Sequence, residues 1–328
     1  MRFSVIIPVR NVEPWLDECL ASLRSQTWRI WECICADDGS FDDSGERLIE
    51  ALREDARFRV VFQPHGNPSR ARNRALGRVR GDVIAFLDGD DAVAPWWLME
   101  AERLLRKTKA DLVRFGIPPR SPSPTIFRPP SGRHEVVRGA DAILSWGWPA
   151  FYDAAYCVLS VVRREVMDGV RFPDVPFKED LLFGFRLLPH LRVVCLSPSV
   201  HYFYRARSSS LVALPQPLAF PLSFLQALRV FPPPRHPTVR RVLAMSAFAV
   251  VVDWLVHPAA GSRHEATTLR GAWLKTVGAL RLSPLGSLVP HWRIGATLFV
   301  TFGWRWPIVL HMWLLRRYGA VRARVRRG

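Results

Sequence analysis

Three acidic residues follow directly on an apolar segment in the first third of the chain. The segment covers residues 83–87, and Asp88, Asp90 and Asp91 come after it with Gly89 among them. The apolar run is continuous rather than alternating, which predicts a strand buried on both faces. Adjacent carboxylates repel one another, and a divalent cation would offset that repulsion. Mg²⁺ and Mn²⁺ prefer oxygen ligands and often bind where a carboxylate meets a substrate phosphate. The alternative is a solvated acidic turn.

A second acidic pair ends another apolar segment. Asp37 and Asp38 follow residues 31–36. In parallel α/β sheets, ligands bind beyond the carboxyl ends of the strands, so both acidic groups are expected at one edge. The sequence has neither G-x-G-x-x-G after its first apolar segment nor G-x-x-x-x-G-K-S/T. A phosphate ligand would therefore be held by a metal and arginine rather than by a glycine-rich loop.

A third acidic pair, Glu179 and Asp180, comes just before apolar residues with helical spacing. Acidic residues are favoured at helix N-termini because of the helix dipole. Position alone therefore leaves open whether this pair stabilises a helix or carries chemistry.

The elements that would position these acids alternate between strand and helix about every fifteen residues. The predicted strands cover residues 3–9, 31–36, 59–62 and 83–87. The predicted helices cover residues 13–24, 42–53 and 69–79. This alternation predicts an α/β fold with a doubly wound, mostly parallel sheet.

The net charge is unevenly distributed along the chain. The 328 residues carry a formal net charge of +17. After residue 212, sixteen basic residues are opposed only by Asp253 and Glu265, so the last third carries most of that charge. A basic segment of this kind binds an anionic surface, either nucleic acid or a membrane.

Length and proline content predict the domain organisation. A chain of 328 residues is long enough for two domains. Prolines cluster within residues 118–130 and again within residues 215–234. The predicted parts are residues 1–115, 116–212 and 213–328. Five cysteines without metal-site spacing, and no evident secretory signal, predict buried reduced thiols in a cytoplasmic protein.

Two apolar segments in the last third, residues 242–256 and 294–315, are interrupted by charged residues or proline. Tryptophans in the second segment and six arginines after it suit the headgroup layer of a membrane. We expect a helical appendage that lies on the inner face of the cytoplasmic membrane. The alternatives are an ordinary helical domain with a solvated basic tail and a true span beginning at Ile294.

Several short motifs, taken together and in order over roughly residues 1 to 115, resemble family 2 glycosyltransferases. These motifs are Ser4–Asn11, Ser22–Thr27, Asp37–Ser40, Ala71–Asn73 and Phe86–Asp91. The resemblance implies the GT-A fold and an activity that uses a nucleotide-diphosphate sugar, with a UDP-sugar as the expected donor and Mn²⁺ or Mg²⁺ as the cofactor.

The resemblance also implies a role for each matching donor-site residue. Pro8 and Arg10 would lie along the base and ribose, and Asp38 would accept a hydrogen bond from the base. Asp88 would contact the ribose, the backbone of Gly89 would approach the donor sugar, and Asp90 would bind the metal together with Asp88. Arg10 departs from the aromatic residue often found at its position. Arg72 and Arg205 would approach the diphosphate.

On the acceptor side, the resemblance implies that Asp180 is the catalytic base and that Glu179 supports the acceptor. The reaction would be a direct, inverting displacement onto a hydroxyl of a glycan or lipid-linked acceptor. Positive groups near the departing diphosphate would stabilise the transition state more than the ground state. His201 could contact metal or phosphate, although a packing role is the simpler interpretation.

Two other functions fit parts of the sequence. A nucleotidyltransferase also combines a doubly wound sheet, acids and a metal, but it would show a glycine-rich segment after the first strand, which residues 8–12 lack. A nucleic-acid-binding protein would place its arginines on a groove-facing element with base-stacking aromatics. Here the arginines follow apolar, tryptophan-bearing segments, so we expect a membrane partner and no nucleic acid.

Overall fold

The computed structural model describes residues 1–116, 132–139, 157–175, 178–206, 217–229 and 263–279, with a few single positions between these ranges. The chain forms two compact units, residues 1–207 and residues 208–328. The predictions for residues 280–328, including the tryptophan-rich segment and the basic end, lie outside the described residues.

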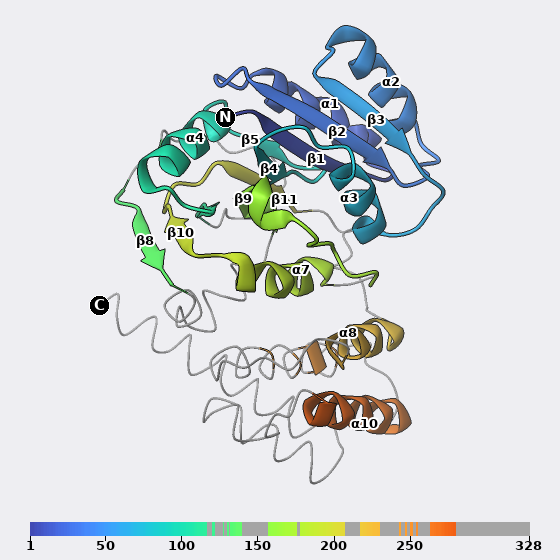
Figure 1. The fold of residues 1–328 in the computed structure, drawn as a ribbon. Helices are drawn as coiled ribbons and strands as arrows, with labels where there is room; N and C mark the ends of the chain where they lie inside the picture. The colour runs from blue at the N-terminus through green and yellow to red at the C-terminus, as the bar shows by residue number, and fades with distance from the viewer. Residues whose placement is uncertain are drawn as a thin grey trace, which may run out of the picture. The chain divides into compact units, whose positions relative to one another are not determined.

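The first part of the chain alternates strands and helices as the sequence predicts (Figure 1). The elements are β1 (Phe3–Val9), α1 (Glu13–Arg24), β2 (Trp31–Asp37), α2 (Ser44–Glu54), β3 (Phe58–Phe62), α3 (Pro68–Leu76) and β4 (Val83–Phe86). Local sequence signals explain where two of these helices begin. Pro14 and Pro68 lie in the first turns of α1 and α3, where a missing N–H leaves no helical bond unmade. The Asn67 side chain caps α3 by accepting from the Arg70 N–H.

The rest of the first unit adds shorter elements. They are β5 (Ala92–Val93), α4 (Trp97–Thr108), β6 (Leu112–Arg114), β7 (Arg120–Ser121), β8 (Glu135–Arg138), η1 (Cys157–Leu159), β9 (Ser160–Arg163), η2 (Arg164–Met167), α7 (Glu179–Leu187), η3 (Leu188–His190), β10 (Val193–Leu196) and β11 (Tyr202–Arg205).

In the described part of the chain, the main sheet has eight strands in the order β3-β2-β1-β4-β9-β6-β10-β8. Strands β3, β2, β1 and β4 are parallel, whereas β9 pairs antiparallel with both β4 and β6, and β8 pairs antiparallel with β10. A smaller sheet has the order β5-β11-β7. The mostly parallel α/β sheet predicted from the sequence is confirmed.

The order of the first four strands fixes where the carboxyl ends meet. The chain moves outward from β1 to β3 and then returns past β1 to β4, so right-handed crossovers put α3 on the opposite face from α1 and α2. The register pairs Val9 at the end of β1 with Asp37 at the end of β2, and Ile6 of β1 with Phe86 of β4. The acids that follow β2 and β4 therefore lie on either side of the end of β1.

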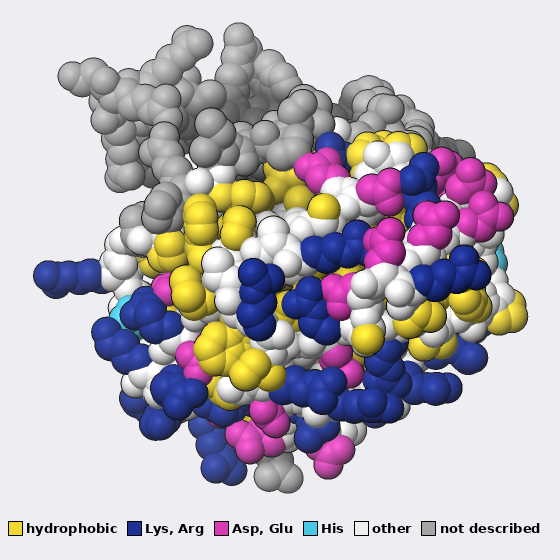
Figure 2. Space-filling model, turned by 90° about the horizontal axis from the view of Figure 1, so that it is seen from above, with side chains coloured by type: hydrophobic (Ala, Val, Ile, Leu, Met, Phe, Trp, Pro, Cys, Tyr) yellow, Lys and Arg dark blue, Asp and Glu magenta, His cyan; other side chains and the backbone are white. Residues whose placement is uncertain are grey.

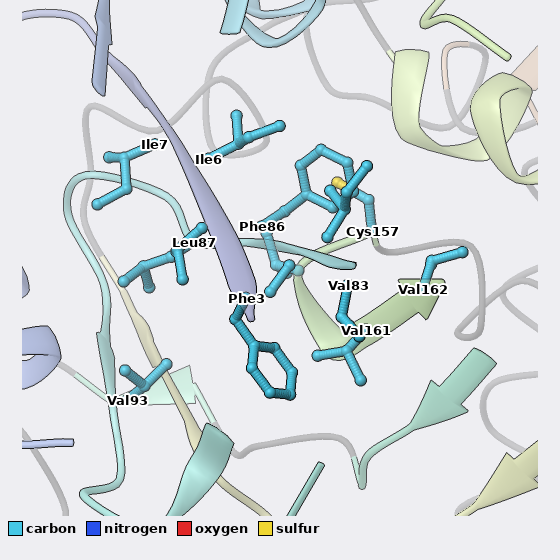
Figure 3. Close-up of a cluster of buried hydrophobic side chains, with 14 of the residues drawn as sticks. Phe3, Ile6, Ile7, Val83, Phe86, Leu87, Val93, Cys157, Val161 and Val162 are labelled. Carbon is cyan, nitrogen blue, oxygen red and sulfur yellow. The ribbon is translucent and has the colours of Figure 1, made fainter. Parts of the chain in front are cut away.

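The core of the first unit is made by these central strands and the helices that cover them. Figure 3 shows part of it, with Phe3 and Ile6 from β1, Phe86 from β4 and Val161 from β9. The five cysteines are all free and buried, as the sequence predicts. On the face seen in Figure 2, basic and acidic side chains are interspersed, in keeping with the nearly balanced charge of the first two thirds of the sequence.

In the second unit, the structure describes α8 (Ala219–Arg229) and α10 (Arg263–Ala279), which pack against each other. Phe224, Leu228 and Trp273 are fully buried, and the Thr276 hydroxyl donates to the Leu225 carbonyl over 3.1 Å. No helix within the described residues is both long and apolar enough to cross a membrane.

Candidate active site

Asp38 lies at the centre of the first group of site residues, just after β2. Its Oδ1 accepts from the Gln63 side chain over 2.6 Å and from the Gly66 N–H over 2.9 Å. Its Oδ2 faces His65 Nδ1 at 3.3 Å and Arg10 Nη1 at 3.7 Å. The neighbouring Asp37 turns back into its own loop, where it accepts from the backbone and hydroxyl of Ser40. Asp38 is buried among its partners, and its predicted hydrogen bond to the base of the donor stays a prediction.

The loop after β1 lies beside the loop after β2 that carries Asp38. Pro8 lies near the end of β1, paired with Ala36, and is partly accessible. Asn11 adopts a left-handed conformation with φ 49, donates its N–H to the Ser40 hydroxyl and accepts from the Phe41 N–H. These bonds tie the two loops together, so that Pro8, Arg10 and Asp38 line one edge of the sheet.

Arg72 of α3 connects the acids that follow β4 with the acidic pair at the start of α7. Its Nη2 donates to Asp88 Oδ1 over 2.8 Å, and its Nη1 donates to Glu179 Oε1 over 2.6 Å. The Arg72 side chain is only 6% exposed, and both carboxylates raise its pKa against the lowering effect of burial. The structure thus brings Arg72 and Asp88 together with Glu179, which lies 107 positions after Arg72 in the sequence. To contact a diphosphate, Arg72 would exchange one of these carboxylates for a phosphate oxygen.

Asp180 lies beside this group at the start of α7. Its Oδ1 accepts from the Leu181 N–H over 2.8 Å. Burial and the neighbouring Glu179 raise the pKa of Asp180 to about 7, while Arg72 works in the opposite direction. A carboxylate with a pKa near neutrality is suited to accept a proton from a substrate hydroxyl. As a whole residue, Asp180 is partly accessible.

The turn after β4 is held by β11. The Tyr202 hydroxyl accepts from the Asp88 N–H over 3.1 Å and donates to Asp91 Oδ2 over 2.6 Å. The Arg205 N–H donates to Asp91 Oδ1, and the Arg205 side chain donates to the Asp90 carbonyl over 2.8 Å and to Glu18 over 2.6 Å. Arg205 therefore braces the turn in this structure, and its predicted contact with the diphosphate stays a prediction.

The acids of this turn differ in what they can do. Asp91 is buried, and burial with the nearby charges of Asp90 and Asp88 raises its pKa to about 8. Asp88 and Asp90 are partly accessible. A side chain at Gly89 would be tightly packed, because a Cβ would lie 3.1 Å from Val12 Cγ2 and 3.3 Å from the Pro8 carbonyl oxygen, so these neighbours would have to move slightly. The turn thus offers two carboxylates outward and keeps the third inside.

Two outward carboxylates suit a Mg²⁺ or Mn²⁺ ion that completes its ligand sphere with water and substrate phosphates. Among the described residues, no group of three or more His, Cys, Asp or Glu side chains is arranged to hold a metal by itself. Asp88 and Asp90 supply only oxygen ligands, so the residues present fit a cation of this kind. The predicted metal role of both residues stays a prediction.

His201 lies away from these acids. It is fully buried, and its ring meets the edge of Phe115 with a centroid distance of 4.7 Å. Burial lowers its pKa to about 4. Neither ring nitrogen has a hydrogen-bond partner within the described residues. The structure supports the packing role for His201.

Sequence reasoning missed five residues of the site: Gln63, His65, Gly66, Glu18 and Tyr202. Gln63 and Gly66 follow β3, which ends beside β2, so their place at Asp38 could have been found from the predicted strand order. Glu18 and Tyr202 act on a turn far away in the sequence, and no local spacing signals those contacts.

The arrangement of acids and arginine at the carboxyl edge of a mostly parallel sheet defines a GT-A-like protein. Residues 4–169 match the model of the family described as glycosyl transferase family 2. The chain belongs to that family, which confirms the resemblance seen in its sequence motifs.

Individual proteins give the same result. EpsJ of Bacillus subtilis, described as an uncharacterized glycosyltransferase, is 28% identical over 65% of this chain and 63% of its own length. GlyA of Streptococcus pneumoniae, described as a glycosyltransferase, is 33% identical over 34% of this chain and 16% of its own length. The chain thus spans less than two thirds of the length of these relatives.

Among solved structures, S. aureus TarS 1-349 is similar in fold, with a TM-score of 0.71. The similarity covers 97% of this chain and 92% of the TarS chain at 17% sequence identity. The same TarS fragment in complex with UDP-GlcNAc has a TM-score of 0.72. At this level of identity the likeness establishes the fold.

Proposed function

We propose that this protein is a metal-dependent, inverting glycosyltransferase. It transfers a sugar from a nucleotide-diphosphate sugar to a hydroxyl of a glycan or lipid-linked acceptor. The observation that carries the proposal is the Arg72 bridge, which joins a carboxylate of the turn after β4 to the acidic pair at the start of α7. Donor-binding and proton-accepting groups thereby share one site.

The chain's own residues account for most of the reaction. Asp180 takes the proton from the acceptor hydroxyl, whose oxygen forms a bond to the anomeric carbon as the bond from that carbon to the phosphate oxygen breaks. The electron pair of the broken bond leaves with the nucleoside diphosphate. A cation at Asp88 and Asp90 would neutralise charge on that leaving group. Arg72 is placed to add to that stabilisation, and a single displacement inverts the anomeric centre.

The donor we propose is a UDP-sugar, and UDP-GlcNAc is the first to test because a TarS structure of the same fold was solved with it. Asp38 would accept from the N–H of the base, with Pro8 and Arg10 along the base and ribose. These assignments are supported by the place of all three residues at one edge of the sheet.

A donor screen with Mn²⁺ or Mg²⁺ tests the proposal. Wild type, Asp90→Ala and Asp180→Asn are compared for UDP-sugar binding by calorimetry and for sugar transfer by release of UDP. Asp90→Ala should lose metal-dependent donor binding. Asp180→Asn should keep donor binding and lose transfer, because an amide cannot accept the proton. Undiminished turnover after chelation, or a normal transfer rate in Asp180→Asn, would overturn the assignment.

We further propose that the basic last third associates with the inner face of the cytoplasmic membrane. The support is its sequence alone, since each arginine near an anionic surface contributes ~1 kcal/mol. The protein should sediment with phosphatidylglycerol vesicles and less with phosphatidylcholine vesicles. Replacing Arg322, Arg324, Arg326 and Arg327 by serine should weaken sedimentation. Retention on duplex DNA instead of vesicles would favour the nucleic-acid alternative.

A further inference from the structure

The Asn73 amide in α3 forms a reciprocal pair of hydrogen bonds with the backbone of Phe172. Asn73 Nδ2 donates to the Phe172 carbonyl over 2.9 Å, and Asn73 Oδ1 accepts from the Phe172 N–H over 2.9 Å. A primary amide carries a donor and an acceptor on one planar group, so it can satisfy both backbone groups at once. This side chain therefore fixes the backbone of a residue 99 positions away in the sequence.

The Phe172 ring continues the connection to α7. It stacks on Phe183 of α7 with a centroid distance of 3.9 Å and an interplanar angle of 5°. Its edge also meets Phe86, the last residue of β4, at 5.4 Å. Phe86 and Phe183 are themselves 5.8 Å apart. Phe172 thus packs between the strand that precedes Asp88 and the helix that begins with Glu179 and Asp180.

The N-cap residue of α7 does not anchor the first turn, in which the Asp180 carboxylate accepts from the Leu181 N–H. Lys178, at the N-cap, adopts a left-handed conformation with φ 55 and makes no side-chain cap hydrogen bond. Ser, Thr, Asn or Asp at an N-cap would anchor a helix start, and lysine cannot accept that bond. Contacts from other elements therefore help to set the place of Asp180, and they include the ion pair of Arg72 with Glu179 and the stacking of Phe172 on Phe183.

We propose that Asn73 is a positioning residue for Asp180. Asn73 does not touch the reacting atoms; it holds Phe172, which holds Phe183 and with it the start of α7. This inference rests on the proposed function, in which Asp180 accepts the proton. The same helix makes a second contact with the segment around Phe172, the ion pair of Arg70 with Asp174. This pair lies at the surface, with the two side chains 60% and 54% exposed. Exposed pairs stabilise little, which makes Arg70 a matched control.

Asn73→Ala is compared with Arg70→Ala for UDP-sugar binding, for kcat and donor KM, and for amide hydrogen exchange of residues 179–187. We expect kcat to fall at least about tenfold in Asn73→Ala, because even a small displacement of a catalytic group strongly lowers the reaction rate. Donor KM should stay within about twofold, and exchange in α7 should quicken. Arg70→Ala should stay within about twofold of wild type in every measurement.

Asn73→Asp is the second variant, because it keeps the shape and the acceptor for the Phe172 N–H but puts a carboxylate oxygen against the Phe172 carbonyl. Asn73→Asp should reproduce the loss of kcat and the faster amide exchange in α7. If Asn73→Ala is insoluble, Asn73→Asp takes its place in the comparison with wild type and Arg70→Ala. An unchanged kcat in the soluble variants would overturn the inference. So would an equal loss of donor binding and kcat with α7 exchange unchanged. If wild type itself transfers no sugar, the proposed function fails, and α7 exchange still decides whether Asn73 positions the helix.

Discussion

Arg72 is the residue on which the electrostatics of the site depend. It is the shared counterion of Asp88 and Glu179, and it opposes the upward shift in the pKa of Asp180. An Arg is suited to this position because its planar group binds two carboxylates at once and stays charged when buried. Replacing Arg72 or Glu179 one at a time should therefore shift the pKa of Asp180 in a direction that can be stated in advance.

The pH dependence of transfer should follow Asp180. The base must be ionised to accept a proton, so kcat/KM should fall below about pH 7, where Asp180 of the free enzyme becomes protonated. Glu179→Gln removes a negative neighbour that raises the pKa of Asp180, so the acid limb should move to lower pH. Arg72→Gln removes a positive neighbour, so the limb should move to higher pH. The measurement is the pH profile of kcat/KM, and a shift of the Glu179→Gln limb to higher pH would contradict this account.

Most candidate donor-site residues could be picked out from the sequence because they lie in short consecutive motifs at strand ends. Asp38, Asp88 and Asp90 are of this kind. Tyr202 and Asn73 could not be assigned their contacts in this way, since their partners lie about a hundred residues away and no spacing rule connects them. Such bracing contacts are set by the tertiary arrangement rather than by local sequence.

At the scale of elements, β11 holds the turn that carries the donor-site acids. Its Tyr202 hydroxyl contacts both the Asp88 backbone and the buried Asp91 carboxyl, so one atom fixes two points of the turn. The smaller sheet, in which β11 pairs with β5, thereby acts on the end of β4 in the main sheet.

Tyr202→Phe should loosen this turn. Removing the hydroxyl leaves the Asp88 N–H and the buried Asp91 carboxyl without that partner, which should lower the free energy of unfolding by ~1–3 kcal/mol. Metal-dependent donor binding should weaken as well, since Asp88 and Asp90 lie in the turn. Denaturant unfolding and calorimetry with UDP and Mn²⁺ check both effects. Unchanged values in both experiments would show that the turn is held without Tyr202.

The early strands and helices were predictable because their apolar runs, prolines and helical spacing are strong local signals. The structure begins and ends these elements within a few residues of the predicted positions. The antiparallel strand β9 was not predictable. It has four residues, and its place between β4 and β6 depends on pairing with strands from distant parts of the chain.

At the scale of the first unit, the two edges of the sheet have different roles. The carboxyl edge carries the candidate chemistry, whereas the amino edge contains a buried polar network around Glu32. Glu32 accepts from the Ser4 hydroxyl over 2.7 Å and from the Arg80 N–H over 2.6 Å, with Arg2 and Arg59 each at 3.4 Å. These partners connect β1, β2 and β3 with the residues before β4.

Glu32→Gln should therefore affect stability and not donor binding. Burial alone would raise the pKa of Glu32, but the bonds from Ser4 and Arg80 and the nearby guanidinium groups outweigh it and lower the pKa. The contribution to stability is then present above the ordinary glutamate pKa of about 4.3 and is lost as the pH falls through the lowered value. The variant should unfold with a free energy ~1–3 kcal/mol lower at neutral pH, and this difference should shrink in acid. Thermal unfolding against pH, with UDP binding as the control, checks this.

The double pairing of Arg72 has a kinetic consequence. One guanidinium binds both Asp88 and Glu179 in this structure. In the proposed function Glu179 supports the acceptor, so this restraint on Glu179 should last until the donor binds. A cation that draws Asp88 away would release that restraint. Substrates should then add in a compulsory sequence, nucleotide sugar before acceptor, and the free nucleotide should inhibit competitively against the sugar nucleotide alone.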